Sequence, residues 1–76
     1  MADMDTWEKR YAAAQRHVDT GRRAIGHQRS IIASQAALRL NSQASRELLA
    51  AIERSQEIFE STLTRLQAER VRGQSA

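Results

Sequence analysis

Apolar side chains recur at alternating intervals of four and three residues through the first half of the chain. This spacing places them on one side of an α-helix, as in the seam of a coiled coil. The largest members are seven residues apart, and small or polar residues alternate with them. The first seam consists of Trp7, Tyr11, Ala14, Val18, Gly21, Ile25, Gln28, Ile32 and Gln35.

A second seam has the same spacing but a different register. It consists of Leu49, Ile52, Gln56, Phe59, Leu63 and Leu66. Continuing the first seam would instead reach the charged residues Arg39, Arg46 and Glu53. A change of frame therefore lies between residues 36 and 48, either as an irregularity in one long helix or as a turn between two helices.

Asn41 and Ser42 favour a turn. Asparagine tolerates the left-handed conformation that closes a helix, and either residue can cap the next helix. At the start of the chain, Asp5-Thr6-Trp7-Glu8 fits the spacing of a capping box. The run 36–40 is also good helix sequence, so one continuous helix of more than about 60 residues stays an alternative.

We therefore predict an all-α antiparallel helical hairpin with coiled-coil-like packing. The predicted helices cover about 5–39 and 42–71, with a turn at about 40–42 and disordered ends at 1–4 and 73–76. Trp7 and Tyr11 are expected to pack against Leu63 and Leu66 at the open end. The predicted core and dimer residues are Trp7, Tyr11, Val18, Ile25, Ile32, Leu49, Ile52, Phe59, Leu63 and Leu66.

The apolar content is small for an independent fold. Thirteen of the hydrophobic residues are alanine, there is no cysteine, and the chain has only two histidines. Because a chain of this size usually needs disulfides, a metal or a second subunit, we predict a homodimer in the form of a four-helix bundle. Outside the seams, Ile31, Leu38, Leu48 and Ile58 are expected to cover the second interface. Gln28, Gln35 and Gln56 are expected to fix the register.

Basic residues are concentrated in the first half. Residues 9–46 carry eight basic side chains and one acidic one, whereas residues 47–76 carry four basic and five acidic ones. An oriented charge pattern can steer association, so Arg22, Arg23 and Arg29 are predicted to contact an acidic protein partner. In the alternative interpretation these arginines pair with Glu53, Glu57 and Glu60 of the second helix.

Three other classes of function have less support in the sequence. Nucleic acid would be attracted through its phosphates, but no aromatic side chains are interleaved with the arginines to stack bases. His17, followed by Thr20 and Gly21, loosely resembles the phosphorylated histidine of phosphotransfer modules, although these usually carry a lysine where Thr20 stands. The chain offers no nucleophile and base at useful spacing, no cofactor motif and no metal-ligand set. We predict a non-enzymatic interaction or scaffold protein.

The chain resembles short helical proteins of alpha-proteobacteria, largely rhizobial, whose function is unknown. The resemblance rests on Arg16-His17-Val18, Gly21, Ile25, Gln28-Arg29, Ile31-Ile32, Ala44, Arg46-Glu47-Leu48-Leu49 and Arg65-Leu66. It implies a cap at Asn41-Ser42, and it implies no role for any residue. Such proteins tend to carry a glycine between the helices, where this chain has Leu38, Arg39 or Leu40.

Membrane and export signals are not expected. No stretch approaches the ~18 consecutive apolar residues of a membrane span. The first five residues, Met-Ala-Asp-Met-Asp, lack the basic and apolar regions of a signal peptide. A cytoplasmic protein is therefore predicted.

Overall fold

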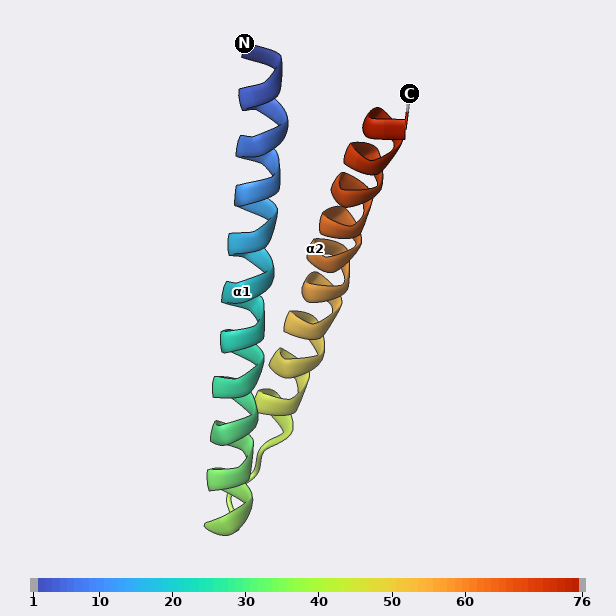
Figure 1. Cartoon of the computed structure of the whole chain (residues 1–76). Coiled ribbons are helices and arrows are strands. Elements are labelled where there is room, and N and C mark those ends of the chain that lie inside the picture. Colours follow the sequence, from blue (N-terminus) through green and yellow to red (C-terminus); the bar gives the residue numbers. More distant parts are fainter. Residues whose placement is uncertain (1, 76) are drawn as a thin grey trace.

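Two long antiparallel helices, joined by a turn, make up the structure (Figure 1). It is a computed structural model that describes residues 2–75, with the side chains of residues 6–73. Helix α1 spans Ala2–Ala37 and helix α2 spans Gln43–Ser75. Together they form an elongated hairpin of 58 × 18 × 14 Å. The predicted all-α hairpin is confirmed, and the alternative of one continuous helix is wrong.

Both helices extend further at the open end than the sequence predicted. Helix α1 begins at Ala2 rather than at residue 5, and helix α2 continues to Ser75 rather than to residue 71. The segments expected to be disordered, 1–4 and 73–76, are therefore helical wherever they are described, while residues 1 and 76 lie outside the described residues. Alanine, methionine and glutamine favour helix, and no proline interrupts either end. The capping box thus does not mark the start of α1.

Helix α1 closes at Arg39, whose backbone is left-handed with φ of 59°. The Leu40 amide donates to the Gln35 carbonyl at 2.8 Å, and the Arg39 amide donates to the Ala36 carbonyl at 3.0 Å. These two bonds form a Schellman motif, which satisfies carbonyls that the last helical turn leaves unpaired. The prediction that Asn41 closes the helix in this conformation is wrong, because Asn41 lies two residues beyond the point where these bonds form.

Asn41 and Ser42 start helix α2, as the sequence predicted for a cap. The Asn41 side-chain oxygen accepts a hydrogen bond from the Gln43 amide at 2.9 Å. The Ser42 carbonyl accepts from the Arg46 amide at 2.9 Å, which is the first bond of the α2 ladder. Ser42 is buried at the start of α2, whereas residues 38–41 of the turn are exposed.

The contact between the helices encloses only a small apolar core. Among the described side chains, the buried hydrophobic residues are Ala14, Val18 and Leu66. The other predicted core residues face the partner helix but stay partly exposed; they are Trp7, Tyr11, Ile25, Ile32, Leu49, Ile52, Phe59 and Leu63. Two helices cover each other on one side only, so solvent reaches the flanks of both seams. A single hairpin therefore leaves much apolar surface exposed to solvent.

Three side chains donate hydrogen bonds across the contact to main-chain carbonyls of the opposite helix. The bonds run from Trp7 Nε1 to Leu66 O at 3.1 Å, from Gln56 Nε2 to Val18 O at 2.9 Å, and from Gln28 Nε2 to Ser45 O at 3.0 Å. A helical carbonyl can accept them because it keeps a second lone pair beside its bond within the helix. Since carbonyls sit at fixed heights along a helix, these three bonds define the register.

Gln56 occupies a notch that only glycine provides. A Cβ added at Gly21 would lie 2.7 Å from Cδ of Gln56, closer than real contacts allow, with the amide oxygen nearer still. The missing side chain at Gly21 thus lets the Gln56 amide reach the Val18 carbonyl. Gln56 Oε1 is buried without a hydrogen-bond partner among the described residues.

Aromatic side chains hold the open end of the hairpin. The rings of Trp7 and Tyr11 stack with centroids 4.8 Å apart, and the Arg70 guanidinium lies 4.7 Å from the Trp7 ring. The Gln67 amide donates to the Tyr11 hydroxyl at 3.2 Å. The stack joins two residues of α1, whereas the cation–π contact and the bonds to Leu66 and from Gln67 attach the first turns of α1 to α2.

Substitution Arg39→Gly should stabilise the protein. A left-handed conformation costs a residue with a side chain roughly 1–2 kcal/mol, and glycine avoids this cost while adding some entropy to the unfolded chain. We expect a gain of about 0.5–1 kcal/mol in the free energy of unfolding, measured with urea at one protein concentration. Arg54→Gly, in the middle of α2, is the control and should lose about 1 kcal/mol. A loss at Arg39→Gly would contradict the assigned turn.

Replacing the two glycines of α1 by alanine should have opposite effects. Gly21→Ala drives a methyl group into the Gln56 amide, and we expect a loss of about 1–2 kcal/mol. Gly26 has no neighbour within 4 Å of an added Cβ, so Gly26→Ala should gain up to about 1 kcal/mol from helix propensity alone. Thermal unfolding of the two variants checks this. Equal stabilisation by both would show that Gln56 does not need the notch.

Candidate interaction surfaces

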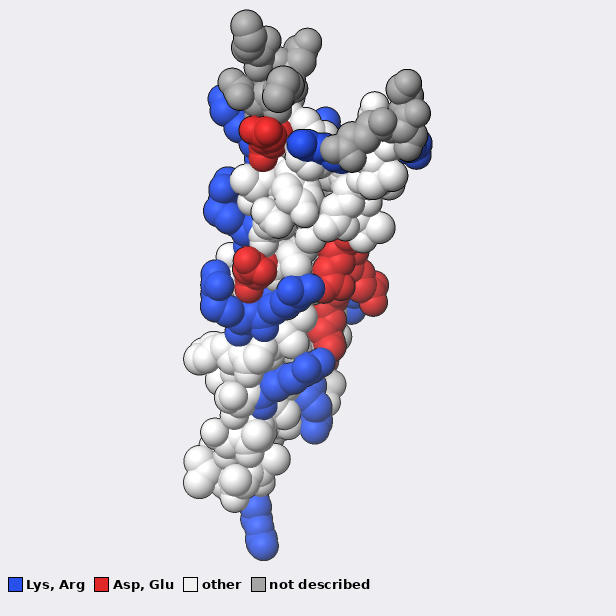
Figure 2. Space-filling model, viewed as in Figure 1, with Lys and Arg blue, Asp and Glu red and all other residues white. Residues whose placement is uncertain are grey.

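The contact between the helices divides the hairpin into two broad faces of different chemistry. On one of them, the charged face, an open groove of about 380 Å³ runs between the helices. Figure 2 views this face, where blue side chains of α1 meet red side chains of α2 halfway along the molecule. The groove is lined by Arg22, Ile25, Gly26, Arg29, Glu53, Gln56, Glu57 and Glu60.

Two ion pairs bridge the helices across the charged face. Arg22 lies 3.7 Å from Glu60, and Arg29 lies 3.3 Å from Glu53. All four side chains keep between 44 and 66 % of their surface exposed, so water screens both pairs. Pairing with Glu53 and Glu60 is therefore confirmed for two of the arginines, and no such contact is seen between them and Glu57 among the described residues.

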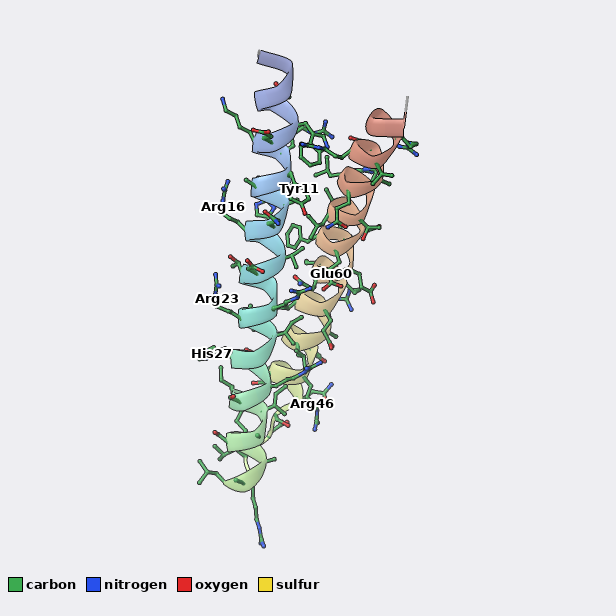
Figure 3. All side chains as sticks on the ribbon, viewed as in Figure 1. Tyr11, Arg16, Arg23, His27, Arg46 and Glu60 are labelled. Carbon is green, nitrogen blue, oxygen red and sulfur yellow. The ribbon has the colours of Figure 1, made fainter. Side chains whose placement is uncertain are left out.

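The three arginines predicted to bind a partner do not form one surface. Arg22 and Arg29 point toward α2, where their charges are compensated. Arg23 points away from α2 (Figure 3), and its guanidinium lies 3.4 Å from the Thr20 hydroxyl on its own helix. Of these three, only Arg23 carries its charge outward.

A row of basic side chains follows the outer side of α1. Arg16 and Arg23 project from it in Figure 3, and Lys9 precedes them by the same interval of seven residues. All three are exposed. We call Lys9, Arg16 and Arg23 the basic edge. It is a cationic part of α1 for which no ion pair with a glutamate of α2 is seen among the described residues.

The opposite face of the hairpin, here the uncharged face, has no Lys, Arg, Asp or Glu over most of its length. A second groove, of about 290 Å³, lies on this face, on the other side of the helix contact from the ion pairs. His17, Thr20, Ala24, Ser55 and Phe59 line this groove. Helical spacing extends the face through Ala13, His27, Ile31, Ser34 and Leu38 on α1, and through Ala44, Leu48, Ala51, Ile58 and Thr62 on α2.

The four hydrophobic residues predicted outside the seams all fall on the uncharged face. Leu38, Leu48 and Ile58 are 70 %, 52 % and 66 % exposed, and Ile31 is partly exposed. Exposure of several large apolar residues on one face of a small protein marks an interaction surface more often than isolated exposure does. These residues do not contribute to the core of the single hairpin.

His17 contacts an aromatic ring in this groove. Its centroid lies 5.0 Å from that of Phe59, with the two planes inclined by 49°. Its neighbours in the groove are apolar or hydroxyl side chains and the amide of Gln56, and no lysine lines it. His17 and His27 belong to no group of three His, Asp or Glu side chains that could hold a metal, and none exists elsewhere among the described residues.

Neither described helix is long and apolar enough to cross a membrane.

Several residues of the uncharged face were not singled out from the sequence. Ala24, Ala51, Ser55 and Thr62 are small and occur where a solvent-exposed helix could equally carry them. The signal that could have identified them is an absence of charge. In each helix, two heptad positions on the same side of the seam carry no Lys, Arg, Asp or Glu, from residue 13 to 38 in α1 and from residue 44 to 62 in α2. The flanking positions on the charged side hold Arg22, Arg29, Glu53, Glu57 and Glu60.

The ion pairs should contribute little to stability. A double-mutant cycle with Arg29→Gln and Glu53→Gln should give a coupling energy below about 1 kcal/mol, because exposed pairs are screened and lose side-chain entropy when they form. Urea unfolding at low salt and at about 1 M salt measures this coupling, which should shrink as the Debye length falls. Coupling well above 1 kcal/mol would mean that charge pairing, rather than the seam, holds the helices together.

Comparison with known proteins does not assign the chain to a family. No family model, no curated protein and no solved structure matches it. The resemblance to helical proteins of alpha-proteobacteria therefore stays a prediction from the sequence. The two faces and the basic edge are the features from which a function can be inferred.

Proposed function

We propose that the protein is a non-enzymatic interaction or scaffold protein with a regulatory role, which acts as a homodimeric four-helix bundle. In this proposal each hairpin supplies two helices, and the basic edge of α1 meets an acidic surface of a protein partner. The exposure of Leu38, Leu48 and Ile58 on one face is the observation that carries it.

The small core supports self-association. Burying a large aliphatic side chain stabilises a protein by roughly 1.5–3 kcal/mol. The single hairpin leaves this stabilisation unused at five exposed large hydrophobic residues among the described side chains, three of them on the uncharged face, and only partly used at most of the seam. A second copy would cover such side chains, and four-helix bundles bury their apolar positions in this way.

The distribution of charge supports the basic edge as the contact for another protein. Arg22 and Arg29 are compensated by Glu60 and Glu53, so they add little net field at the charged face. Lys9, Arg16 and Arg23 have no glutamate of α2 opposite them. Their charges follow one line along an exposed helix, which suits an elongated acidic surface. The proposal thus keeps Arg23 from the predicted set and replaces Arg22 and Arg29 by Lys9 and Arg16.

The geometry gives less support to the other candidate functions. Three cations in a row could attract phosphates, but the stacked aromatic pair lies at the open end and Tyr11 is turned toward α2 (Figure 3). His17 lies against Phe59 in an apolar groove, whereas a phosphorylated histidine needs surroundings that accept the charge of a phosphate. A cytoplasmic location stays a prediction, which microscopy of a fluorescently tagged chain tests.

Dimer mass and partner capture can be measured on the same material. Light scattering at micromolar concentration should give twice the monomer mass. The tagged dimer should capture a protein from an extract of its source organism, and the pair Arg16→Gln with Arg23→Gln should lose at least about tenfold in that capture. The pair Arg46→Gln with Arg54→Gln removes the same charge from α2 and should retain it.

Helix content by circular dichroism must be the same in both charge variants. Capture that is unchanged by the substitutions at Arg16 and Arg23 would exclude the basic edge. Capture of material absorbing at 260 nm, lost steeply with rising salt, would replace the protein partner by nucleic acid. A monomer at micromolar concentration would contradict the dimeric bundle.

A further inference from the structure

We infer that the uncharged face is the docking site for a second copy of this chain, with the two uncharged faces in contact and both turns at the same end of the bundle. This inference rests on the proposed dimer and adds the surface and the alignment. The basic edges and the charged faces then lie on the outside.

The chemistry of the face selects its occupant. Between residues 13 and 38 of α1 and between 44 and 62 of α2, the face carries alanine, serine, threonine, histidine, leucine and isoleucine and no Asp, Glu, Lys or Arg. Such a surface offers little to a partner recognised by its charge, although the Arg23 guanidinium lies at its margin, 3.4 Å from the Thr20 hydroxyl. It fits another long, uncharged and moderately apolar surface, and the same face of a second copy has these properties over the same length.

The available area suits a stable dimer. The uncharged face covers most of a side that measures 58 by 18 Å. This is on the order of the roughly 800 Å² per partner that a standard specific interface buries. The open groove between His17 and Phe59 lies near the centre of the face, so the apposed faces would also close it. Leu38, Leu48 and Ile58 would pass from solvent into the interface.

The alignment follows from the heights of the residues. A two-fold axis parallel to the hairpin keeps every residue at its own height and places α1 of one copy over α2 of the other. Heights within the hairpin are known from the bonds that join Val18 to Gln56 and Gln28 to Ser45. Ala24 lies between these two levels and is therefore near the height of Leu48.

With this alignment, two of the large side chains of one copy, Leu48 and Ile31, lie near small side chains of the other. Leu48 faces the level of Ala24, and Ile31 lies within about one helical turn of the level of Ala44, whereas Ile58, two residues beyond Gln56, lies near the level of His17. Pairing of large with small residues lets side chains interdigitate without voids. The arginines and glutamate at the open end of the face, Arg10, Arg65 and Glu69, then stay together and away from the leucines.

The opposite alignment is less favourable. A two-fold axis across the hairpin places α1 over α1, with the turns at opposite ends. Full overlap then brings Arg10 of one copy to about the height of Ile31 of the other, so a charge lies over the apolar part of the face. Burial of a charge without a partner is costly. The same-end alignment avoids this contact.

Two serines of α2 provide a matched test of the face. Ser55 is on the uncharged face and Ser61 is on the outer side of the same helix, and both are exposed in the hairpin. Ser55→Glu should raise the dimer dissociation constant at least about 100-fold, because it places charges from both copies in the apolar interface. Ser61→Glu should change it less than about threefold. Sedimentation equilibrium measures both, and circular dichroism verifies that each variant keeps its helix content.

The outcomes distinguish an error in the proposed interface from an error in the proposed oligomeric state. Loss of association in Ser55→Glu alone is the expected result. If the wild type dimerises and Ser55→Glu dimerises equally well, or if both variants dissociate, the uncharged face is not the interface while the proposed dimer stands. If the wild type is a monomer, both the dimer and the face are excluded.

A spin label tests the alignment. The chain contains no cysteine, so Leu40→Cys at the turn can be labelled specifically. Same-end docking places the two labels within about 30 Å of each other, since helices in bundles pack 8–10 Å apart and the label adds its own length. Opposite-end docking separates them by nearly the 58 Å length of the hairpin. Pulsed electron paramagnetic resonance distinguishes these distances, and a long one would overturn the alignment.

Discussion

The hydrogen bond from the Gln56 amide to the Val18 carbonyl, made above Gly21, determines where each helix stands against the other. Apolar seams alone would tolerate a shift by one heptad, because leucine, isoleucine and valine recur every seven residues. An amide that must find a carbonyl across a glycine does not tolerate such a shift. Gln56 Oε1 is buried and has no hydrogen-bond partner among the described residues, and a buried acceptor left in that state typically costs about 1–3 kcal/mol. Gln56 thus lowers the stability of the hairpin but selects a single register, which is the usual effect of a polar residue in a coiled-coil seam.

The chemistry of both faces depends on that register. It brings Arg22 opposite Glu60 and Arg29 opposite Glu53, so opposite charges of the two helices gather on one flank. The same register aligns the charge-free flanks of α1 and α2 on the other side, where each would be too narrow alone. A one-heptad shift would pair other residues at the ion pairs and stagger the uncharged flanks. The polar contact in the seam therefore organises both faces, and Gln56 itself lines the groove on each of them.

The hairpin could be predicted because large apolar residues at intervals of three and four dominate both halves and a change of frame separates them. The residue that closes α1 could not, because the Schellman bonds depend on where the last carbonyls of the helix lie, and Arg39 has no preference for a left-handed backbone. Helical spacing predicts which arginines lie on the same side of α1. The glutamates that these arginines contact depend on the register between the helices. That register is set by Gln56 packing at Gly21, a contact between the two seams that neither seam predicts by itself. The small residues of the uncharged face carry no individual signal.

The three bonds that cross from side chains to carbonyls also define an order of assembly. Their partners are 17, 38 and 59 residues apart in the chain, counted from the turn outward. Because the entropy lost on closing a loop increases with its length, the hairpin is expected to close from Ser42 toward the termini, each bond shortening the loop that the next must close. The protein has one tryptophan, and it makes the outermost of these bonds. Trp7 fluorescence therefore follows the last contact to form and the first to break, whereas helix signals average over the whole hairpin.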